Sequence, residues 1–313
     1  MEDLRGALRA YGLEQAGAER IAGGLSAAAY AVRDGRGRYF LKAYDRRDAQ
    51  TRQWTERIAL YMPVLARLAA SDALRGRIVR PVPARDGAYS VQDGERVYIL
   101  FDFVPGRAAG FGHMTRAQTL ELAETMALLH GQAVPPEARR LEADGSLTFC
   151  DALEGWLADG FTALPADAAA VLRPCREPLL EKIGRTRALA PAVERSGARK
   201  VLCHTDAHGM NLIQGERLVL VDWEGLALAP AEADLFMFAA RESWPLFLAR
   251  YRAVRPDAQV SAERLAFYAC RRKLEDVAAF LERVVQPGLP GAERAQALAY
   301  LAAECRDLEA FCF

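Results

Sequence analysis

Short runs of alternating apolar and polar residues dominate the first hundred positions, and this period of two is typical of half-buried strands. The clearest runs are Ala28–Val32, Arg38–Lys42 and Arg96–Phe101. Asp34 and Gly35 stand between the first two runs. Because an Asp-Gly pair favours the tight turn of a β-hairpin, the first two strands are predicted to pair directly.

Two stretches of the same region are predicted helices. Residues 1–20 are expected to form the first, and the second is expected over 51–69. In the second stretch, large apolar side chains recur every three or four residues, at Trp54, Ile58, Tyr61 and Leu65. Pro63 lies inside this helix, where its missing N–H favours a kink. The first hundred residues are therefore predicted to form an antiparallel sheet that carries one main helix.

The pattern changes at Val104-Pro-Gly106, beyond which the chain is mostly helical. An amphipathic helix is predicted from Thr115 to His130, with Thr115 and Gln118 as the candidates for a capping box. Further helices are expected near 150–160, 176–190, 232–253, 261–285 and 291–311, and strands are expected at 201–203 and 218–221. The sequence thus predicts an α+β protein with a small lobe at 1–103 and a larger helical lobe at 104–313.

Composition limits the partners and the compartment. Lys plus Arg and Asp plus Glu number 41 each, so no bulk charge favours nucleic acid or an anionic membrane as a partner. No apolar run reaches the roughly 18 residues of a transmembrane helix. The cysteines are scattered without a CxxC pair, and the N-terminus lacks the layout of a signal peptide. A cytoplasmic protein with reduced thiols is expected.

The segment from His204 to Asn211, His-Thr-Asp-Ala-His-Gly-Met-Asn, carries the strongest chemical signal. Phosphoryl transfer to an alcohol needs a carboxylate that orients the hydroxyl and accepts its proton, and it needs oxygen ligands for Mg²⁺. Asp206 is the candidate for the first role. Asn211, and Asp222 at the end of the next strand, are the candidates for the second. We predict a loop that exposes Asp206 and turns back through Gly209, with a short hairpin that delivers Asp222 to the same pocket.

These motifs resemble those of the aminoglycoside phosphotransferase family, whose relatives include choline and methylthioribose kinases. The likeness is tightest over 200–238 and is closest to the spectinomycin phosphotransferase branch. It is carried by Val201-Leu-Cys-His-Thr-Asp-Ala-His-Gly-Met-Asn-Leu, Val219-Leu-Val-Asp-Trp-Glu and Leu228-Ala-Pro-Ala-Glu-Ala-Asp-Leu235. The resemblance implies a two-lobed, protein-kinase-like fold and ATP or GTP as the phosphate donor, with Mg²⁺. It also implies Asp206 as the catalytic carboxylate and Asn211 and Asp222 as metal ligands.

A kinase also needs a cation on the nucleotide phosphates, held by an acidic partner on a helix. Lys42 lies in the apolar strand 39–43, where a charge needs a reason. Glu56, in the helix that follows, is the predicted partner, whereas Asp45, Asp48 and Glu95 fit the order of the elements less well. An edge-strand lysine and a solvated glutamate are the alternative interpretations of the two residues.

A glycine-containing loop, Gly23-Gly-Leu-Ser26, precedes the first strand rather than a helix, so it is not a Walker loop. It is similar to the family's loop over the nucleotide phosphates. Many relatives carry Asn where this chain has Ala27–Ala29. The resemblance therefore leaves Ser26 and backbone N–H groups as the expected phosphate ligands.

The segment Ile99–Gly106 joins the two halves and is similar to the family's hinge, which receives adenine. There, the carbonyl of Asp102 and the N–H of Val104 would pair with the edge of the base. Phe101 would line the back of the same pocket. An apolar linker between two lobes is the alternative interpretation.

The acceptor alcohol is left open by the sequence. The resemblance favours an aminoglycoside or aminocyclitol of the spectinomycin kind, whose ammonium groups carboxylates such as Glu275, Asp276 and Glu282 could bind. Arg271-Arg-Lys273 equally fits an anionic acceptor. The alternatives are a metabolic kinase acting on choline, homoserine, methylthioribose or a sugar, and a nucleotide-binding pseudokinase. The complete set of core groups disfavours the pseudokinase.

Overall fold

The structure, a computed structural model, describes residues 4–21 and 27–308. The chain divides into two compact units. The first comprises Met1–Glu142, Val201–Ala229 and Pro245–Asp257, and the second comprises Ala143–Lys200, Pro230–Trp244 and Ala258–Phe313. This division places the segment around Asp206 with the N-terminal sheet. The predicted lobes, 1–103 and 104–313, differ in their bounds from these two units, and the predicted boundary stays a prediction.

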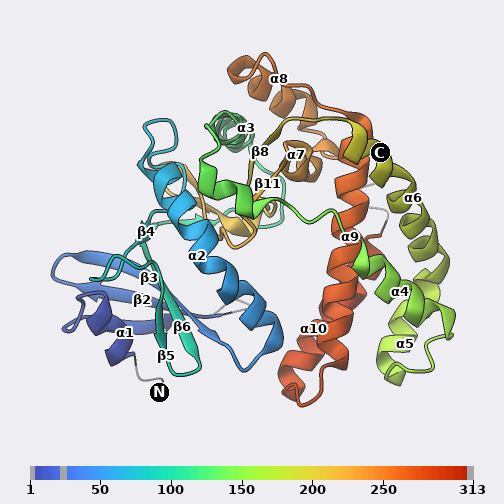
Figure 1. The fold of residues 1–313 in the computed structure, drawn as a ribbon, viewed down its shortest axis with the longest axis horizontal. Coiled ribbons are helices and arrows are strands. Elements are labelled where there is room, and N and C mark those ends of the chain that lie inside the picture. The colour runs from blue at the N-terminus through green and yellow to red at the C-terminus, as the bar shows by residue number, and fades with distance from the viewer. Residues whose placement is uncertain (1–3, 22–26, 309–313) are drawn as a thin grey trace. The chain divides into compact units, whose positions relative to one another are not determined.

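An antiparallel sheet forms the N-terminal part of the first unit (Figure 1). Its strands are β1 (Gly17–Ile21), β2 (Ala28–Asp34), β3 (Gly37–Asp45), β4 (Pro81–Val82), β5 (Val91–Asp93) and β6 (Arg96–Asp102). They lie in the order β1-β2-β3-β6-β4, and β5 also pairs with β6. The three strands predicted from the alternating pattern are present. Asp34 closes the β2–β3 hairpin by accepting hydrogen bonds from the backbone N–H groups of Arg36 and Gly37.

The predicted N-terminal helix is shorter than expected. It ends early, as α1 (Arg5–Ala10), and the chain then forms β1 within the stretch predicted to be helical. Gly12, at φ +71°, makes the left-handed turn that separates the two. The second predicted helix is α2 (Ala49–Ala70), which contains Pro63 and begins where Asp48 accepts a hydrogen bond from the N–H of Thr51. Apolar residues of α1 pack on the sheet face that carries Leu41 and Ala43.

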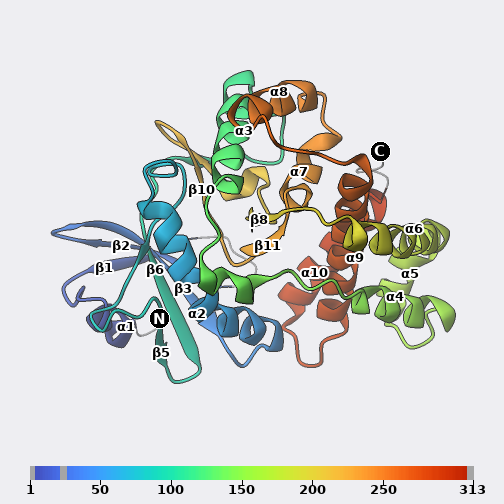
Figure 2. The same ribbon diagram turned by 45° about the horizontal axis from the view of Figure 1, so that its top comes forward.

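The remaining elements of the first unit frame the predicted catalytic segment. They are β7 (Arg107–Ala108), α3 (Arg116–His130), the 3₁₀ turn η1 (Pro136–Leu141), β8 (Lys200–Cys203), the 3₁₀ turn η3 (Gly209–Asn211), β9 (Leu212–Gln214), β10 (Leu218–Leu220), β11 (Ala227–Pro230) and α8 (Trp244–Val254). The predicted capping box of α3 is confirmed, because Thr115 and Gln118 exchange side-chain-to-backbone hydrogen bonds. Helices α3 and α8 lie side by side, joined by an ion pair between Glu124 and Arg250 (Figures 1 and 2).

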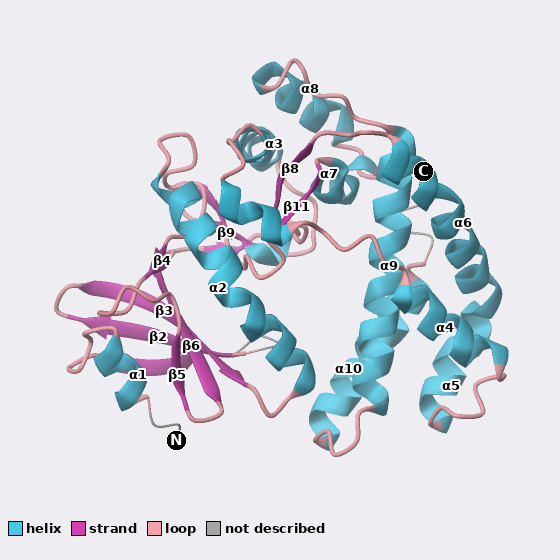
Figure 3. Ribbon diagram, in the orientation of Figure 1, coloured by secondary structure: helices cyan, strands magenta, loops and turns pink. Residues whose placement is uncertain are grey.

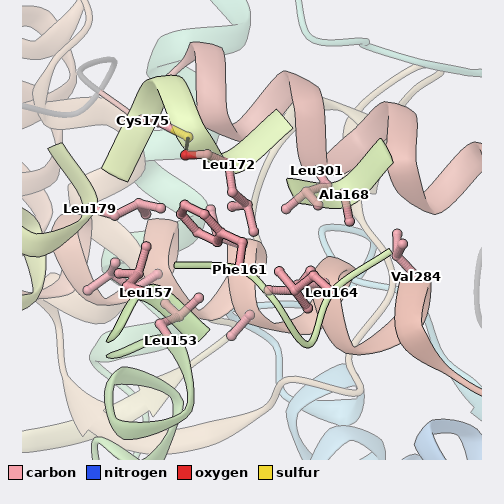
Figure 4. Packing of buried hydrophobic residues seen from close by; sticks show 14 of the residues in the cluster. Leu153, Leu157, Phe161, Leu164, Ala168, Leu172, Cys175, Leu179, Val284 and Leu301 are labelled. Carbon is pink, nitrogen blue, oxygen red and sulfur yellow. Dashed lines mark hydrogen bonds between the residues drawn. The ribbon is translucent and has the colours of Figure 1, made fainter. Parts of the chain in front are cut away.

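The second unit is built from helices (Figure 3). They are α4 (Thr148–Ala158), α5 (Ala166–Leu172), the 3₁₀ turn η2 (Arg173–Cys175), α6 (Arg176–Arg195), α7 (Glu232–Ala239), α9 (Ala262–Val285) and α10 (Gly291–Arg306). Leu153, Leu157 and Phe161 are buried in its core beside residues of α5, α6, α9 and α10 (Figure 4). The single helix predicted over 232–253 is two helices, α7 and α8, and α5 was not predicted. In the described part of the chain, no helix has both the length and the apolar character needed to cross a membrane.

Candidate active site

The loop after β8 brings Asp206 and Asn211 together. The short turn η3 reverses the chain, so that the side-chain amide of Asn211 donates to the carbonyl oxygen of Asp206 at 2.9 Å and to its carboxylate Oδ2 at 3.0 Å. Thr205, directly before Asp206, has φ +69°, a conformation that costs a β-branched residue energy and that is common at functional sites. The predicted turn-back of this loop is therefore present, with both side chains on one side of it.

His204 ties this loop to the strand that leads to Asp222. The backbone N–H of Asp206 donates to Nδ1 of His204 at 3.2 Å, so the proton of the neutral ring is on Nε2. Nε2 in turn contacts the carbonyl oxygen of Val221 at 2.9 Å. The imidazole is buried and meets the indole of Trp223 edge to face, with the ring centroids 4.7 Å apart. These contacts set the position of Asp206 relative to Asp222.

Asp222 is delivered by the hairpin of β9 and β10, as predicted from the strand spacing. The backbone N–H of Val221 bonds to the carbonyl of Asn211 at 2.9 Å. Asp222 itself has φ +68°, in the left-handed region that residues other than glycine rarely adopt. Gly225 completes the turn: a Cβ there would lie 2.4 Å from Oγ1 of Thr205 and 2.9 Å from the carbonyl oxygen of His204. Only glycine lets the two loops approach this closely.

Lys42 on β3 reaches this turn and pairs with two carboxylates. Its Nζ lies 2.6 Å from Oδ1 of Asp222 and 2.5 Å from Oε1 of Glu224. Tyr44, two residues along β3 and on the same strand face, donates its hydroxyl proton to the same Glu224 oxygen. A lysine in an apolar strand, which the sequence marked as unusual, is thus explained by a buried charge cluster.

Burial and charge push the pKa values of this cluster apart. Burial raises the pKa of Glu224 to about 7, although Lys42 opposes the rise. Burial also acts to raise the pKa of Asp222, but Lys42 and the hydrogen bonds around it hold that pKa well below its usual range. Burial would lower the pKa of Lys42, yet the two carboxylates raise it above its ordinary value. The lysine is therefore charged and pairs with an ionised Asp222, while burial and the charge of Asp222 oppose the ionisation of Glu224.

The other predicted nucleotide ligands are placed as follows. Phe101 is buried on β6, and Asp102 is held at the strand's end by paired contacts from the guanidinium of Arg80. Val104 lies just beyond β6 and is partly exposed. Ser26 lies outside the described residues, so the structure carries no information on its predicted contact.

Glu56 does not meet Lys42. It is exposed on α2, and the ion pairs of Lys42 go to Asp222 and Glu224 instead. The physical reason is the helical register: the interior face of α2 presents apolar and aromatic side chains such as Ile58 and Tyr61, and position 56 falls outside it. The ion pair predicted for Lys42 and Glu56 is therefore not formed in this structure.

The sequence did not single out Tyr44 or Gly110, and it named Glu224 only as the last residue of the Asp-Trp-Glu motif. Glu224 and Tyr44 belong to the charge cluster around Lys42. Gly209 approaches Gly110 so closely that a Cβ would lie 1.8 Å from the Gly110 carbonyl oxygen, and the amide of Gly110 donates to the carbonyl of Gly209 at 3.0 Å. Glu224 stands two residues after Asp222, which suggested that it lies near the site. Because a loop has no fixed side-chain period, the sequence could not predict the direction in which the Glu224 side chain points.

Comparisons with known proteins identify the family of this chain. A model of the phosphotransferase enzyme family matches residues 17–265. The chain belongs to this family. No curated protein sequence matches it. Spectinomycin phosphotransferase APH(9)-Ia, solved with ADP and spectinomycin, superposes with a TM-score of 0.76 at 18% identity, over 98% of this chain and 97% of that one.

Other solved structures are similar over nearly their whole length. A microcompartment-associated aminopropanol kinase has a TM-score of 0.60 at 20% identity, with 97% of this chain and 95% of that chain covered. A thermostable mutant of aminoglycoside phosphotransferase APH(4)-Ia, solved with AMP-PNP and hygromycin B, has a TM-score of 0.57 at 14% identity, with 92% and 93% covered. At these identities the likeness shows the fold, which is the kinase-like α+β fold of the family. The protein is a phosphotransferase, and more narrowly a small-molecule kinase of this family.

The residues of this phosphotransferase fit the metal that its family implies. Mg²⁺ prefers oxygen ligands, and Asp222 and Asn211 offer a carboxylate and an amide oxygen on adjoining segments. The side chain of Asp222 is 43% exposed, so one face of it is open to solvent. Lys42 already places a positive charge beside Oδ1 of Asp222. The donor set is therefore suited to a divalent metal.

Proposed function

We propose that this kinase transfers the γ-phosphate of ATP or GTP to a hydroxyl group of an aminoglycoside or aminocyclitol of the spectinomycin kind. The observation that supports this acceptor most is the match to the spectinomycin phosphotransferase, which extends over 98% of the chain. The arrangement of Lys42, Asp206 and Asp222 supports the reaction, because it provides a cation, a carboxylate and a candidate metal ligand within one compact unit.

Asp206 is the catalytic residue in this proposal. Its carboxylate orients the acceptor hydroxyl and takes its proton as the oxygen bonds to phosphorus, while the bond to the leaving nucleoside diphosphate breaks. Asn211 holds that carboxylate in place through the hydrogen bond to Oδ2. Because the proton moves late in a loose transition state, Asp206 first orients the acceptor hydroxyl and then accepts its proton.

The donor triphosphate is bound by groups on two segments. Lys42 neutralises negative charge on the phosphates. Asn211 and Asp222 are the residues that would hold Mg²⁺, which supplies charge neutralisation on the phosphate oxygens when bound. Ser26 is proposed as a further phosphate ligand on the strength of the family resemblance.

The base is proposed to bind at the end of β6. The N–H of Val104 and the carbonyl of Asp102 are the hydrogen-bonding groups, and Phe101 lines the pocket. The paired contacts from Arg80 already occupy the side chain of Asp102, which supports a role for its main chain rather than its carboxylate. A bound base would thus contact main-chain atoms of Asp102. Substitutions of the Asp102 side chain should therefore change nucleotide binding little.

A smaller amino alcohol is the second candidate acceptor. The aminopropanol kinase supports it, because its structure is similar over 97% of this chain at 20% identity. Two of the candidate carboxylates on α9 favour neither acceptor, because Glu275 and Asp276 are already ion-paired with Arg271 and Arg272 one turn away. The choice between the two acceptors therefore requires an assay.

A release assay for nucleoside diphosphate tests the proposal. The enzyme is incubated with ATP or GTP and Mg²⁺ against spectinomycin, a panel of aminoglycosides, and small alcohols that include aminopropanol, choline, homoserine and methylthioribose. The proposal expects release that depends on spectinomycin or an aminoglycoside, and a product that has gained one phosphoryl group by mass spectrometry. Release driven only by the small alcohols would replace the acceptor, and slow hydrolysis without response to any acceptor would refute it.

A further inference from the structure

Lys42 is shared by two carboxylates that lie two residues apart in the same turn. Asp222 and Glu224 both come within hydrogen-bonding distance of Nζ, and the side chain of Lys42 is 15% exposed. Removal of the carboxylate partners of Lys42 would destabilise the protein, because an unpaired buried charge is strongly unfavourable. The two carboxylates, however, differ in their surroundings, and the difference separates their roles.

Glu224 is the buried and fixed member of the pair. Its side chain is 13% exposed, against 43% for Asp222. Its Oε1 accepts hydrogen bonds from both Lys42 and the hydroxyl of Tyr44, a residue that is itself almost fully buried. Its Oε2 is buried, and among the described residues no donor reaches it. Glu224 therefore depends on Lys42 for charge compensation, whereas Asp222 can exchange partners with solvent ligands.

The helix that was expected to supply the acidic partner does not do so. Glu56 is the only carboxylate within α2, and it is exposed. The interior face of the helix presents Tyr61, whose pKa is raised by burial and then by the charge of Glu224. Arg57 donates to the carbonyl oxygen of Leu226 at 3.1 Å, which fastens the helix to the segment that follows Glu224. The helix thus packs around the Lys42 cluster without adding a carboxylate to it.

We propose that Glu224, and not Glu56, is the positioning residue that holds Lys42 in place for the nucleotide phosphates. The proposal rests on the proposed role of Lys42 in phosphate binding. Asp222 is the candidate metal ligand and cannot at the same time be the fixed partner of Lys42. A second carboxylate, Glu224, therefore takes that role. Tyr44 supports Glu224 from the same strand as Lys42, which makes the three side chains one unit.

Substitution of Glu224 by Gln tests the proposal, since the amide keeps the size of the side chain and removes its charge. A misplacement of a charged group by about 1 Å typically costs about 10²-fold in rate, so Glu224→Gln is expected to lower kcat/KM for the nucleotide by about that factor. Glu224→Asp keeps the charge and should recover part of the loss. Glu56→Gln, and Glu19→Gln on exposed β1 as a matched control, should stay within about twofold.

A second measurement detects the contact without turnover. The thermal midpoints of Lys42→Met, Glu224→Gln and the double variant form a mutant cycle. If the two residues compensate each other, the double variant unfolds at a higher temperature than the sum of the two single losses predicts. Binding of AMP-PNP and GMP-PNP with Mg²⁺, followed by calorimetry, should weaken less in Glu224→Gln than kcat falls. A residue with only a structural role would not separate these two effects.

The outcomes that overturn the proposal are specific. A folded Glu224→Gln variant with wild-type kcat/KM would exclude Glu224 as the positioning residue, and so would a large loss in Glu56→Gln alone. Additive midpoints in the mutant cycle would exclude the coupling, whatever happens to activity. Nucleotide binding and the cycle need no acceptor, so a wrong acceptor class would show itself in the release assay and leave this test intact.

Discussion

Replacement of Asp206 by Asn isolates the chemical role of the carboxylate. Asn211 donates its amide proton to Oδ2 of Asp206 at 3.0 Å, and the amide oxygen of the new side chain can accept the same bond. The backbone contact from Asn211 to the carbonyl of residue 206, at 2.9 Å, does not involve the side chain at all. The substituted side chain therefore keeps its position and loses only its negative charge and its ability to accept a proton.

The magnitude follows from what is removed. General-base assistance contributes about 10² to 10⁴ in rate, which corresponds to about 3 to 5 kcal/mol of transition-state stabilisation. Asp206 makes no ion pair with Lys42, whose partners are Asp222 and Glu224. Nucleotide affinity should therefore stay close to the wild-type value while kcat falls by about 10² to 10⁴.

The assay pairs calorimetry of AMP-PNP binding with steady-state turnover of the best acceptor from the release screen. Asp72→Asn is the matched control, because the side chain of Asp72 is 95% exposed and lies in the first unit. Wild-type turnover in Asp206→Asn would refute the assignment of the catalytic carboxylate. It would direct attention to His208, whose Nε2 lies 3.4 Å from Oδ2 of Asp206.

Three further substitutions test the rest of the site. Lys42→Met should raise the nucleotide KM and lower kcat in the steady-state assay, because the phosphates lose their cation; unchanged constants would contradict its role. Asp222→Ala should abolish turnover and weaken nucleotide binding in Mg²⁺ while circular dichroism stays native; retained kcat would exclude it as a metal ligand. Gly209→Ala should lower stability by about 1 to 3 kcal/mol and reduce kcat, since a Cβ would lie 1.8 Å from the carbonyl oxygen of Gly110. Gly145→Ala, where no atom lies within 4 Å of the added Cβ, is its control in chemical denaturation, and equal effects would refute the packing argument.

Local features of the fold could be predicted because each depends on residues close together in the chain. The hairpin at Asp34 and the capping box at Thr115 involve side chains and backbone groups within three residues of one another. The errors have a local origin too. The expected helix over 1–20 ends at a left-handed glycine, Gly12, and its continuation pairs with β2, a contact that helical propensity does not register.

The loop around Asp206 and the hairpin that follows it could be predicted from the sequence. The spacing of Asp206, Asn211 and Asp222 is short enough that one loop and one hairpin bring the three together, so motif and geometry coincide. The carboxylates that pair with Lys42 could not be predicted, because the contacts join segments that are far apart in the chain. Glu224 lies 182 residues away in the chain, and no periodicity links a strand residue to a residue in a distant turn. The exposure of Glu56 also follows from packing. Successive residues of a helix are rotated by about 100° around its axis, so the orientation of α2 about that axis decides whether Glu56 points inward or outward. The packing of α2 sets this orientation.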